Sequence, residues 1–221
     1  MSGWRVLTAE RRRMWCPVAL ALRDEFTGGT ALGKPLFTLE RQAGTRWLPT
    51  DLTPVMTSGG IYAWPGLGRS SDPAALPLSR VRITITLDAQ VPFYRVTDDA
   101  LEFDVPAWND NHDPALSPIM PQTVLLAPGP AYPFSRNVRV LRGRVLDTGG
   151  QPVRDALLVA DGLERAITDA SGAYSLALRW QAPSGPVQVA VSHPRSGRSA
   201  LVNAALPADL AGLIESLRAA S

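Results

Sequence analysis

The stretch that decides the fold begins at Val138 and reads VRVLRGRVL (residues 138–146), followed by DTGGQPV (residues 147–153). Apolar and polar residues alternate over much of the first segment, which is the period of a β-strand with one buried face. The Asp, Gly and Pro residues of the second segment are those that form tight turns. The stretch therefore predicts a strand that ends in a tight turn.

The chain beyond this turn continues as short apolar segments separated by turn residues. Asp161-Gly162 stands between two such segments and is a hairpin signal. A second turn is expected at residues 169–172. Strands are expected at residues 156–160, 165–168, 173–178, 187–191 and 200–206. Short strands separated by Gly- and Pro-rich turns predict a small β-sandwich.

Several residues of this region carry a resemblance to a known family. They are Arg142-Gly143-Arg144-Val145, Gly149-Gly150-Gln151-Pro152-Val153, Ala156 and Thr168-Asp169-Ala170-Ser171-Gly172-Ala173-Tyr174-Ser175-Leu176. The set resembles the carboxypeptidase-regulatory-like (transthyretin-like) domain over residues 138–206. The resemblance implies a seven-stranded Greek-key sandwich that occurs as an accessory module and has no catalytic residues of its own.

The first half of the chain has a similar order of turn and strand features. Gly28-Gly29 with Pro35, Gly59-Gly60 before Tyr62, and the strand-like segments 81–87 and 101–106 occur in the same order as their counterparts after Val138. We therefore expect an all-β protein with two Ig-like or transthyretin-like sandwiches in tandem, at residues 18–107 and 138–206. A helix longer than two turns within residues 33–105 would exclude the interpretation that the first half is a copy of the second. The alternative is that two unrelated sandwiches have the same order of turns and strands.

Three further segments complete the expected organisation. Residues 1–17 form an N-terminal arm. Residues 108–137 form a proline-rich linker, whose apolar residues predict that it lies along a domain surface or adds a strand at residues 123–127. Residues 207–221 predict a C-terminal helix, because Leu210, Leu213, Ile214 and Leu217 fall on one helical stripe.

Composition limits the classes of function. The formal net charge of +2 and the single basic run at residues 11–13 do not favour nucleic-acid binding. The only cysteine, Cys16, excludes a disulfide within the chain. No apolar run reaches the roughly 20 residues of a membrane span, and the segment 11–21 is a poor signal peptide. We expect synthesis in a bacterial cytoplasm and a place in a virion or assembled machine.

Residues suited to catalysis are few, so we expect no enzyme, no catalytic residue, no cofactor and no metal. His112 lies in the polar segment 108–114, which suits a turn better than a metal site. His193 follows a strand, and no nucleophile motif accompanies it. Alternation places Glu102 and Asp104 on the solvent face of a strand.

The six tryptophans suggest interfaces instead. Trp64 and Trp180 follow strand motifs and are expected to pack in a core or at a domain edge. The candidates for contact with other subunits are Trp4, Trp15, Trp108, Tyr132, Phe134, Leu213 and Leu217.

These observations favour a structural or interaction protein, a subunit of an assembly such as a phage tail, baseplate or contractile injection system. The alternatives are a carbohydrate-binding or adhesion module that uses exposed tryptophans, and an accessory domain of a separately encoded enzyme.

Overall fold

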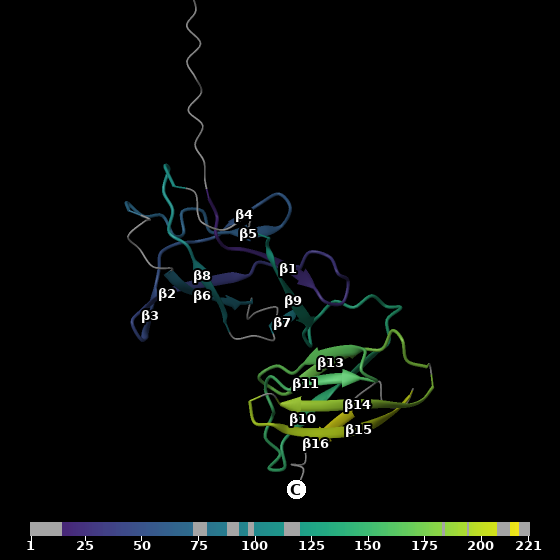
Figure 1. The fold of residues 1–221 in the computed structure, drawn as a ribbon. Coiled ribbons are helices and arrows are strands. Elements are labelled where there is room, and N and C mark those ends of the chain that lie inside the picture. Colours follow the sequence, from purple (N-terminus) through teal and green to yellow (C-terminus); the bar gives the residue numbers. More distant parts are fainter. Residues whose placement is uncertain are drawn as a thin grey trace, which may run out of the picture. The chain divides into compact units, whose positions relative to one another are not determined.

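The computed structural model describes residues 15–72, 79–87, 93–96, 100–112, 120–182, 184–193, 195–206 and 213–216. No helix occurs among these residues, so the expected all-β class is confirmed. The strands are β1 (Ala19–Asp24), β2 (Leu36–Ala43), β3 (Arg46–Pro49), β4 (Val55–Met56), β5 (Ile61–Ala63), β6 (Ser79–Thr86), β7 (Tyr94–Val96), β8 (Leu101–Val105), β9 (Gln122–Pro128), β10 (Val140–Leu146), β11 (Leu157–Ala160), β12 (Glu164–Ile167), β13 (Ala173–Ala177), β14 (Gly185–His193), β15 (Arg198–Leu206) and β16 (Leu213–Ser216) (Figure 1).

The chain forms two compact units, and each is built from three separate segments. The first unit comprises residues 1–21, 38–83 and 101–122, and the second comprises residues 22–37, 84–100 and 123–221. The predicted ranges 18–107 and 138–206 are contiguous, whereas these units interleave. Residues 22–37 and 84–100 are grouped with the second unit, where Asp24 binds Tyr132 and β7 pairs with β9.

The second unit contains a two-layered sandwich. One layer has the strand order β13-β10-β16 and the other has the order β12-β11-β14-β15. Buried side chains from both layers form one apolar core, among them Leu141, Leu158, Leu176 and Val189. Inward residues alternate with outward ones along β14, whose inner positions Val187, Val189 and Val191 are each 2% exposed.

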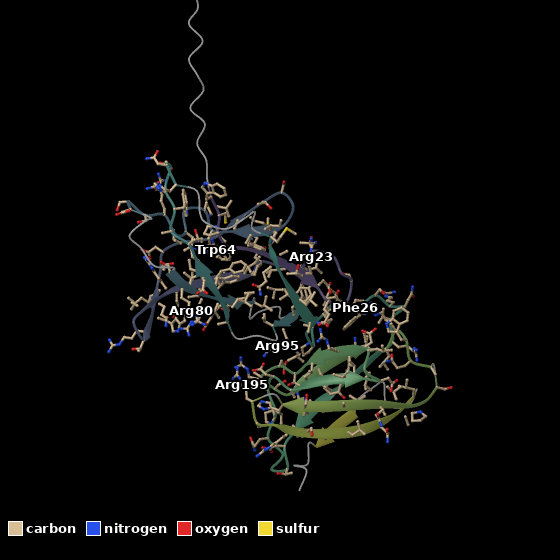
Figure 2. All side chains as sticks on the ribbon, viewed as in Figure 1. Arg23, Phe26, Trp64, Arg80, Arg95 and Arg195 are labelled. Atoms are coloured by element: carbon tan, nitrogen blue, oxygen red, sulfur yellow. The ribbon has the colours of Figure 1, made fainter. Side chains whose placement is uncertain are left out.

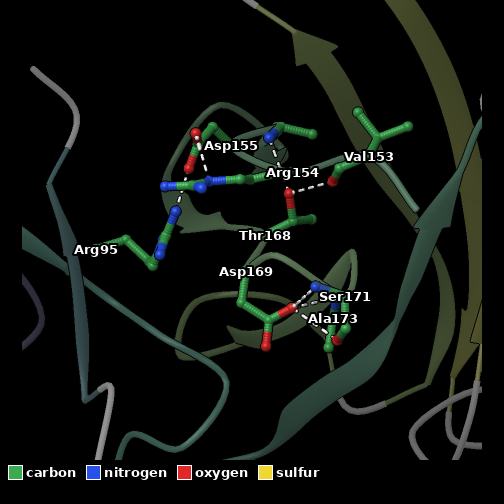
Figure 3. Close-up of polar contacts among 9 residues, drawn as sticks. Arg95, Val153, Arg154, Asp155, Thr168, Asp169, Ser171 and Ala173 are labelled. Carbon is green, nitrogen blue, oxygen red and sulfur yellow. Dashed lines mark hydrogen bonds and ion pairs between the residues drawn. The ribbon is translucent and has the colours of Figure 1, made fainter. Parts of the chain in front are cut away.

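Two aspartate turns connect strands of this sandwich as the sequence predicts. Asp147 Oδ1 accepts hydrogen bonds from the N–H groups of Gly149 and Gln151, both at 2.9 Å. Asp169 Oδ1 accepts from the N–H of Ser171 at 2.8 Å and of Ala173 at 3.0 Å (Figure 3). These side chains supply acceptors for turn amides that no strand partner could satisfy.

Gly172 is required by its position in the second turn. Its φ is 73°, and a Cβ there would collide with the carbonyl oxygen of Val145. The Val145 N–H donates to the Gly172 carbonyl at 2.8 Å, so the turn and β10 lie against each other. Only glycine combines this φ with this close approach.

Thr168 links the same turn to the start of β11. Its Oγ1 donates to the carbonyl of Val153 at 2.6 Å and accepts from the N–H of Ala156 at 2.8 Å. The residue is fully buried, and Figure 3 shows its hydroxyl pointing toward Val153. The threonine of the sequence motif therefore hydrogen-bonds the backbone groups of Val153 and Ala156, just before β11.

In the first unit, β2, β3, β6 and β8 belong to one sheet, in the order β3-β2-β6-β8. The start of β1 pairs with β5, which also pairs with β4. Val81, Ile83 and Val105 are fully buried. Trp64, labelled in Figure 2, lies in the interior at 0% exposure, as the sequence predicts.

Two expectations about connecting segments have different outcomes. The strand expected at residues 123–127 is confirmed as β9. Within the expected C-terminal helix, Leu213–Ser216 instead form β16, which pairs in parallel with β10; the rest of that helix lies outside the described residues. A three-turn helix is marginal by itself, and a sheet edge offers the same residues backbone partners.

The described residues within 33–105 contain no helix. The observation that would have excluded a tandem copy is therefore absent from that part of the chain, and the copy stays a prediction.

Candidate interaction surface

The interface residues expected from the sequence occupy different environments. Trp108 is 2% exposed, and its Nε1–H donates to the carbonyl of Leu67 at 2.6 Å. Tyr132 is also buried, whereas Phe134 and Trp15 are half-buried. Leu213 lies in β16; Trp4 and Leu217 lie outside the described residues. Trp108 and Tyr132 therefore belong to the interior, because each has a polar atom that finds a partner there.

The titratable groups considered for chemistry serve turns and ion pairs. Asn109 Oδ1 accepts from the N–H of His112 at 2.9 Å, which closes the expected turn. His193 Nδ1 lies 2.8 Å from Ser196 Oγ in an exposed turn. Glu102 and Asp104 lie on the exposed face of β8 as expected, and Glu102 pairs with Arg80 at 2.5 Å. No cluster of three potential metal-ligating side chains occurs in the described part of the chain.

A buried carboxylate joins three distant segments of the second unit. Asp24 is 2% exposed, and its Oδ2 accepts from the hydroxyl of Tyr132 at 2.5 Å and of Tyr94 at 3.1 Å. Its Oδ1 accepts from the N–H groups of Phe26 at 2.8 Å and Thr27 at 3.2 Å. We call Asp24 with these four donors the Asp24 hub. The carboxylate is satisfied by four donors, which is what a buried charge requires.

Burial and the neighbouring carboxylate also act on the two phenols. Burial raises the pKa of Tyr94 and of Tyr132, and the hydrogen bonds to Asp24 add to both increases. Both phenols are therefore protonated at neutral pH and donate to Asp24. The hub is a structural connection between segments.

An aromatic cluster extends from the hub toward the surface. The rings of Phe26 and Tyr132 lie edge to face with centroids 5.7 Å apart, and those of Phe26 and Phe134 lie at 5.0 Å. The guanidinium of Arg179 lies over the Phe26 ring at 4.2 Å. Figure 2 labels Phe26 at the end of β1. The cluster therefore connects the hub to Arg179 in the loop after β13.

Arg179 is held in one orientation by several partners. Its Nε donates to Glu164 Oε1 at 2.5 Å, its Nη2 to Glu164 Oε2 at 3.1 Å, and its Nη1 to the carbonyl of Phe26 at 2.6 Å. Glu164 is 5% exposed, so this is a bidentate ion pair with one buried partner. Fixing a long arginine side chain in this way also fixes its backbone.

The residues after Trp180 are fixed as well. Gln181 is 7% exposed, and its Nε2 donates to the carbonyl of Ala160 at 3.5 Å. Arg139 donates to the carbonyls of Gln181 and Ala182. The residues before and after Trp180 in this loop are therefore both held by hydrogen bonds.

Trp180 itself is 70% exposed. Leu163, which is 62% exposed, directly precedes the Glu164 that Arg179 binds. Leu163 ends the turn of the β11–β12 hairpin, in which Asp161 and Gly162 both have positive φ. The Glu164–Arg179 ion pair therefore has an exposed apolar residue next to each partner. We call Trp180 and Leu163 the Trp180 surface.

Two more ion pairs connect the segments of this unit. Arg165 binds Glu25, and Arg95 of β7 binds Asp155, whose φ is 58°. Figure 3 shows Arg95 and Arg154 meeting at the Asp155 carboxylate. These ion pairs connect β7 and the segment after β1 to the β11–β12 region of the sandwich.

Trp180 follows a strand motif and was expected to pack in a core or at a domain edge, but its side chain is 70% exposed. The strand ends at Ala177, and the next residues follow a loop rather than the strand period. A signal was available: the Gln181–Gly185 segment contains Pro and Gly and is typical of a loop.

Comparisons with known proteins do not assign this chain to a family. No protein-family model matches the chain, and no curated protein matches it either. Among the described residues there is no helix with the length and apolar character needed to cross a bilayer.

Proposed function

We propose that this chain is a non-enzymatic structural or interaction protein that contacts another protein through the Trp180 surface, as a subunit of a larger assembly such as a phage tail, baseplate or contractile injection system. The observation that carries the proposal is an exposed tryptophan on a loop whose flanking residues are fixed by buried polar groups. Trp180 is 70% exposed, whereas its neighbour Gln181 is 7% exposed.

A rigid, exposed aromatic side chain suits protein binding for two reasons. Tryptophan is among the residues that contribute most to interface affinity, because it buries a large area with few rotatable bonds. A loop that is already fixed loses little further conformational entropy on binding, which increases affinity. The first reason applies to the Trp180 side chain itself. The second applies because the contacts of Arg179 and Gln181 hold the loop that carries Trp180.

The environment of the other tryptophans favours a protein partner over a glycan. A sugar-binding platform uses several exposed, coplanar rings. Of the tryptophans in the described residues, Trp64 and Trp108 are buried, Trp15 and Trp47 are half-buried, and Trp180 is exposed. A single exposed ring, with the exposed Leu163 next to the ion-pair partner of Arg179, resembles the apolar centre of a protein interface.

The proposal is tested by quantitative affinity capture from the producing cells with tagged wild-type protein and the variant Trp180→Ala. We expect a partner that the variant retains at least tenfold less, because an interface tryptophan commonly contributes about 2 kcal/mol or more. Leu36→Ala is the matched control, since Leu36 is 65% exposed on β2 and removal of its side chain leaves the Trp180 surface intact.

Equal capture by wild-type protein and Trp180→Ala would contradict the proposal. A glycan array run in parallel with both proteins distinguishes the carbohydrate alternative. Binding to one glycan class that Trp180→Ala abolishes would replace the protein partner by a sugar.

A further inference from the structure

Strand β15 forms an edge of the four-stranded layer of the sandwich. The order is β12-β11-β14-β15, so among the described residues β15 has a strand neighbour on one side. It pairs with β14 over nine consecutive residues without a bulge, from Arg198 opposite His193 to Leu206 opposite Gly185. Figure 1 shows the two strands running side by side. Such a regular, long edge can accept another strand.

The direction of the backbone groups in β15 follows from its neighbour. The Gln188 N–H donates to Asp161 Oδ1 at 3.1 Å, and the Gln188 carbonyl accepts from the Asp161 N–H at 2.9 Å. Both groups of Gln188 therefore point toward β11, and the pair Gln188–Asn203 has no hydrogen bonds of its own. Because this alternates along an antiparallel ladder, Ser199, Leu201, Asn203 and Ala205 point their N–H and C=O groups away from β14. Ala205 already has an interaction partner, so the part of the edge considered for pairing is residues 199–203.

The side chains of this edge offer none of the usual protection against pairing. Edge strands are commonly blocked by lysine, proline, inward charges or a bulge. In β15 the sequence RSALVNAAL has one charge, Arg198, at its first position and no proline. Leu201 is 61% exposed on the outer face, where it lies opposite Ala190 of β14.

We propose that two copies of this chain associate through β15, antiparallel and centred on Leu201. In this register Leu201 pairs with Leu201 of the second copy, and Ser199 pairs with Asn203. Each of these pairs exchanges two backbone hydrogen bonds, because all three residues direct their groups to the edge. The two four-stranded layers become one continuous sheet.

The strand is complementary to itself in this register. The two exposed leucines meet on the outer face, and the Ser199 and Asn203 side chains flank them as a polar pair. Arg198 lies opposite Ala204, and the two Arg198 residues are about 20 Å apart at the rise of a strand. That distance exceeds the screening length of about 8 Å at physiological salt, so the only charges of the strand do not repel. A second copy therefore fits the edge better than a strand of unspecified sequence.

The proposal is tested with the full chain by sedimentation velocity over a range of concentrations up to about 100 µM, a range in which a dimer of micromolar dissociation constant is populated. We expect wild-type protein to dimerise with increasing concentration. Leu201→Lys and Leu201→Glu place like charges side by side at the two-fold axis, and each should weaken the dimer at least tenfold. An equimolar mixture of the two variants should recover the dimer, because opposite charges then face each other.

Two control variants distinguish loss of the β15 dimer from a general effect of added charge and from loss of the Trp180 contact. Ala190→Lys places the same charge on the same face, one strand away from the edge, and should still dimerise. Trp180→Ala should dimerise like wild-type protein, so loss of the proposed partner contact and loss of the dimer are distinguishable. Circular dichroism melting verifies that each variant is folded. A monomeric wild-type protein, a Leu201→Lys variant that dimerises normally, or a mixture that stays monomeric would each overturn the proposal.

Discussion

Two regions of the second compact unit reach stability by different routes. The sandwich at residues 138–206 has an apolar core from consecutive strands, connected by turns that their own side chains close. The segments carrying Asp24, Tyr94 and Tyr132 come from distant parts of the chain and meet at one buried carboxylate. The first region is local in sequence and apolar, and the second is non-local and polar.

The difference teaches where each region is vulnerable. A core of many apolar contacts loses stability gradually with each removed methylene. A polar hub loses several hydrogen bonds at once when its single acceptor is removed, and the two tyrosine hydroxyls left behind are buried. Four variants that remove a hub acceptor, a turn glycine, a bridging hydroxyl and an exposed ring test this contrast.

Asp24→Ala should have the largest effect. It removes the acceptor of two buried tyrosine hydroxyls and two turn amides. We expect a loss of about 4 kcal/mol in the free energy of unfolding, measured by urea denaturation. Hydrogen exchange should show lost protection around Tyr94 and Tyr132 before the sandwich core is affected.

Asp147→Ala is the matched control for the hub, because Asp147 also accepts two turn amides but lies at the surface of a turn. Its loss should be about 1 kcal/mol, since water replaces the acceptor. Equal losses for the two variants would mean that burial of the hub contributes nothing.

Gly172→Ala should rank second, with a loss of about 3 kcal/mol. The substitution introduces a Cβ at a φ of 73° and against the Val145 carbonyl oxygen, so the turn or β10 must move. Thermal denaturation of the full chain measures the change. Gly150→Ala is the control: its φ of 77° is similar, but no atom lies within 4 Å of a Cβ there, so it should lose only about 1 kcal/mol.

Thr168→Val should cost about 2 kcal/mol. The variant keeps the shape of the side chain but leaves the buried Ala156 N–H and Val153 carbonyl without the hydroxyl. Urea denaturation measures this loss, and Thr168→Ser should recover most of it because it restores the hydroxyl. A neutral Thr168→Val would show that the backbone groups find other partners.

Trp180→Ala should have the smallest effect on stability, within about 0.5 kcal/mol of wild type, because the side chain is 70% exposed. Urea denaturation checks this. A loss of more than about 2 kcal/mol would show that Trp180 packs as part of the fold, contrary to its proposed role in binding.

How far the sequence predicts the fold depends on whether a partner is local. The turns at Asp147 and Asp169 and the strands around them are predictable, because acceptor and donors lie within five residues. The sequence does not predict strand β7, since the strand is short and its partner residues in β9 lie 30 to 34 positions further along the chain. The helix expected near Leu213 was wrong at Leu213–Ser216 because pairing with β10 is non-local.

The interface candidates show the same limit. Trp108 and Tyr132 lie in a proline-rich segment that resembles a surface linker, yet their polar atoms bind Leu67 and Asp24, which are distant in sequence. Trp180 was expected to pack in a core or at a domain edge, yet it is exposed on a loop held by the Glu164–Arg179 pair and the Arg139 contacts.

The sequence by itself determined the all-β class, the aspartate turns and the alternation of β14 and β15, since these depend on residues a few positions apart. Only the tertiary structure decided that Asp24 joins three segments, that Trp180 is exposed on a fixed loop and that β15 is an edge. The physical reason is that burial, ion pairing and edge position are properties of contacts between distant residues, whereas strand period and turn chemistry are properties of neighbours.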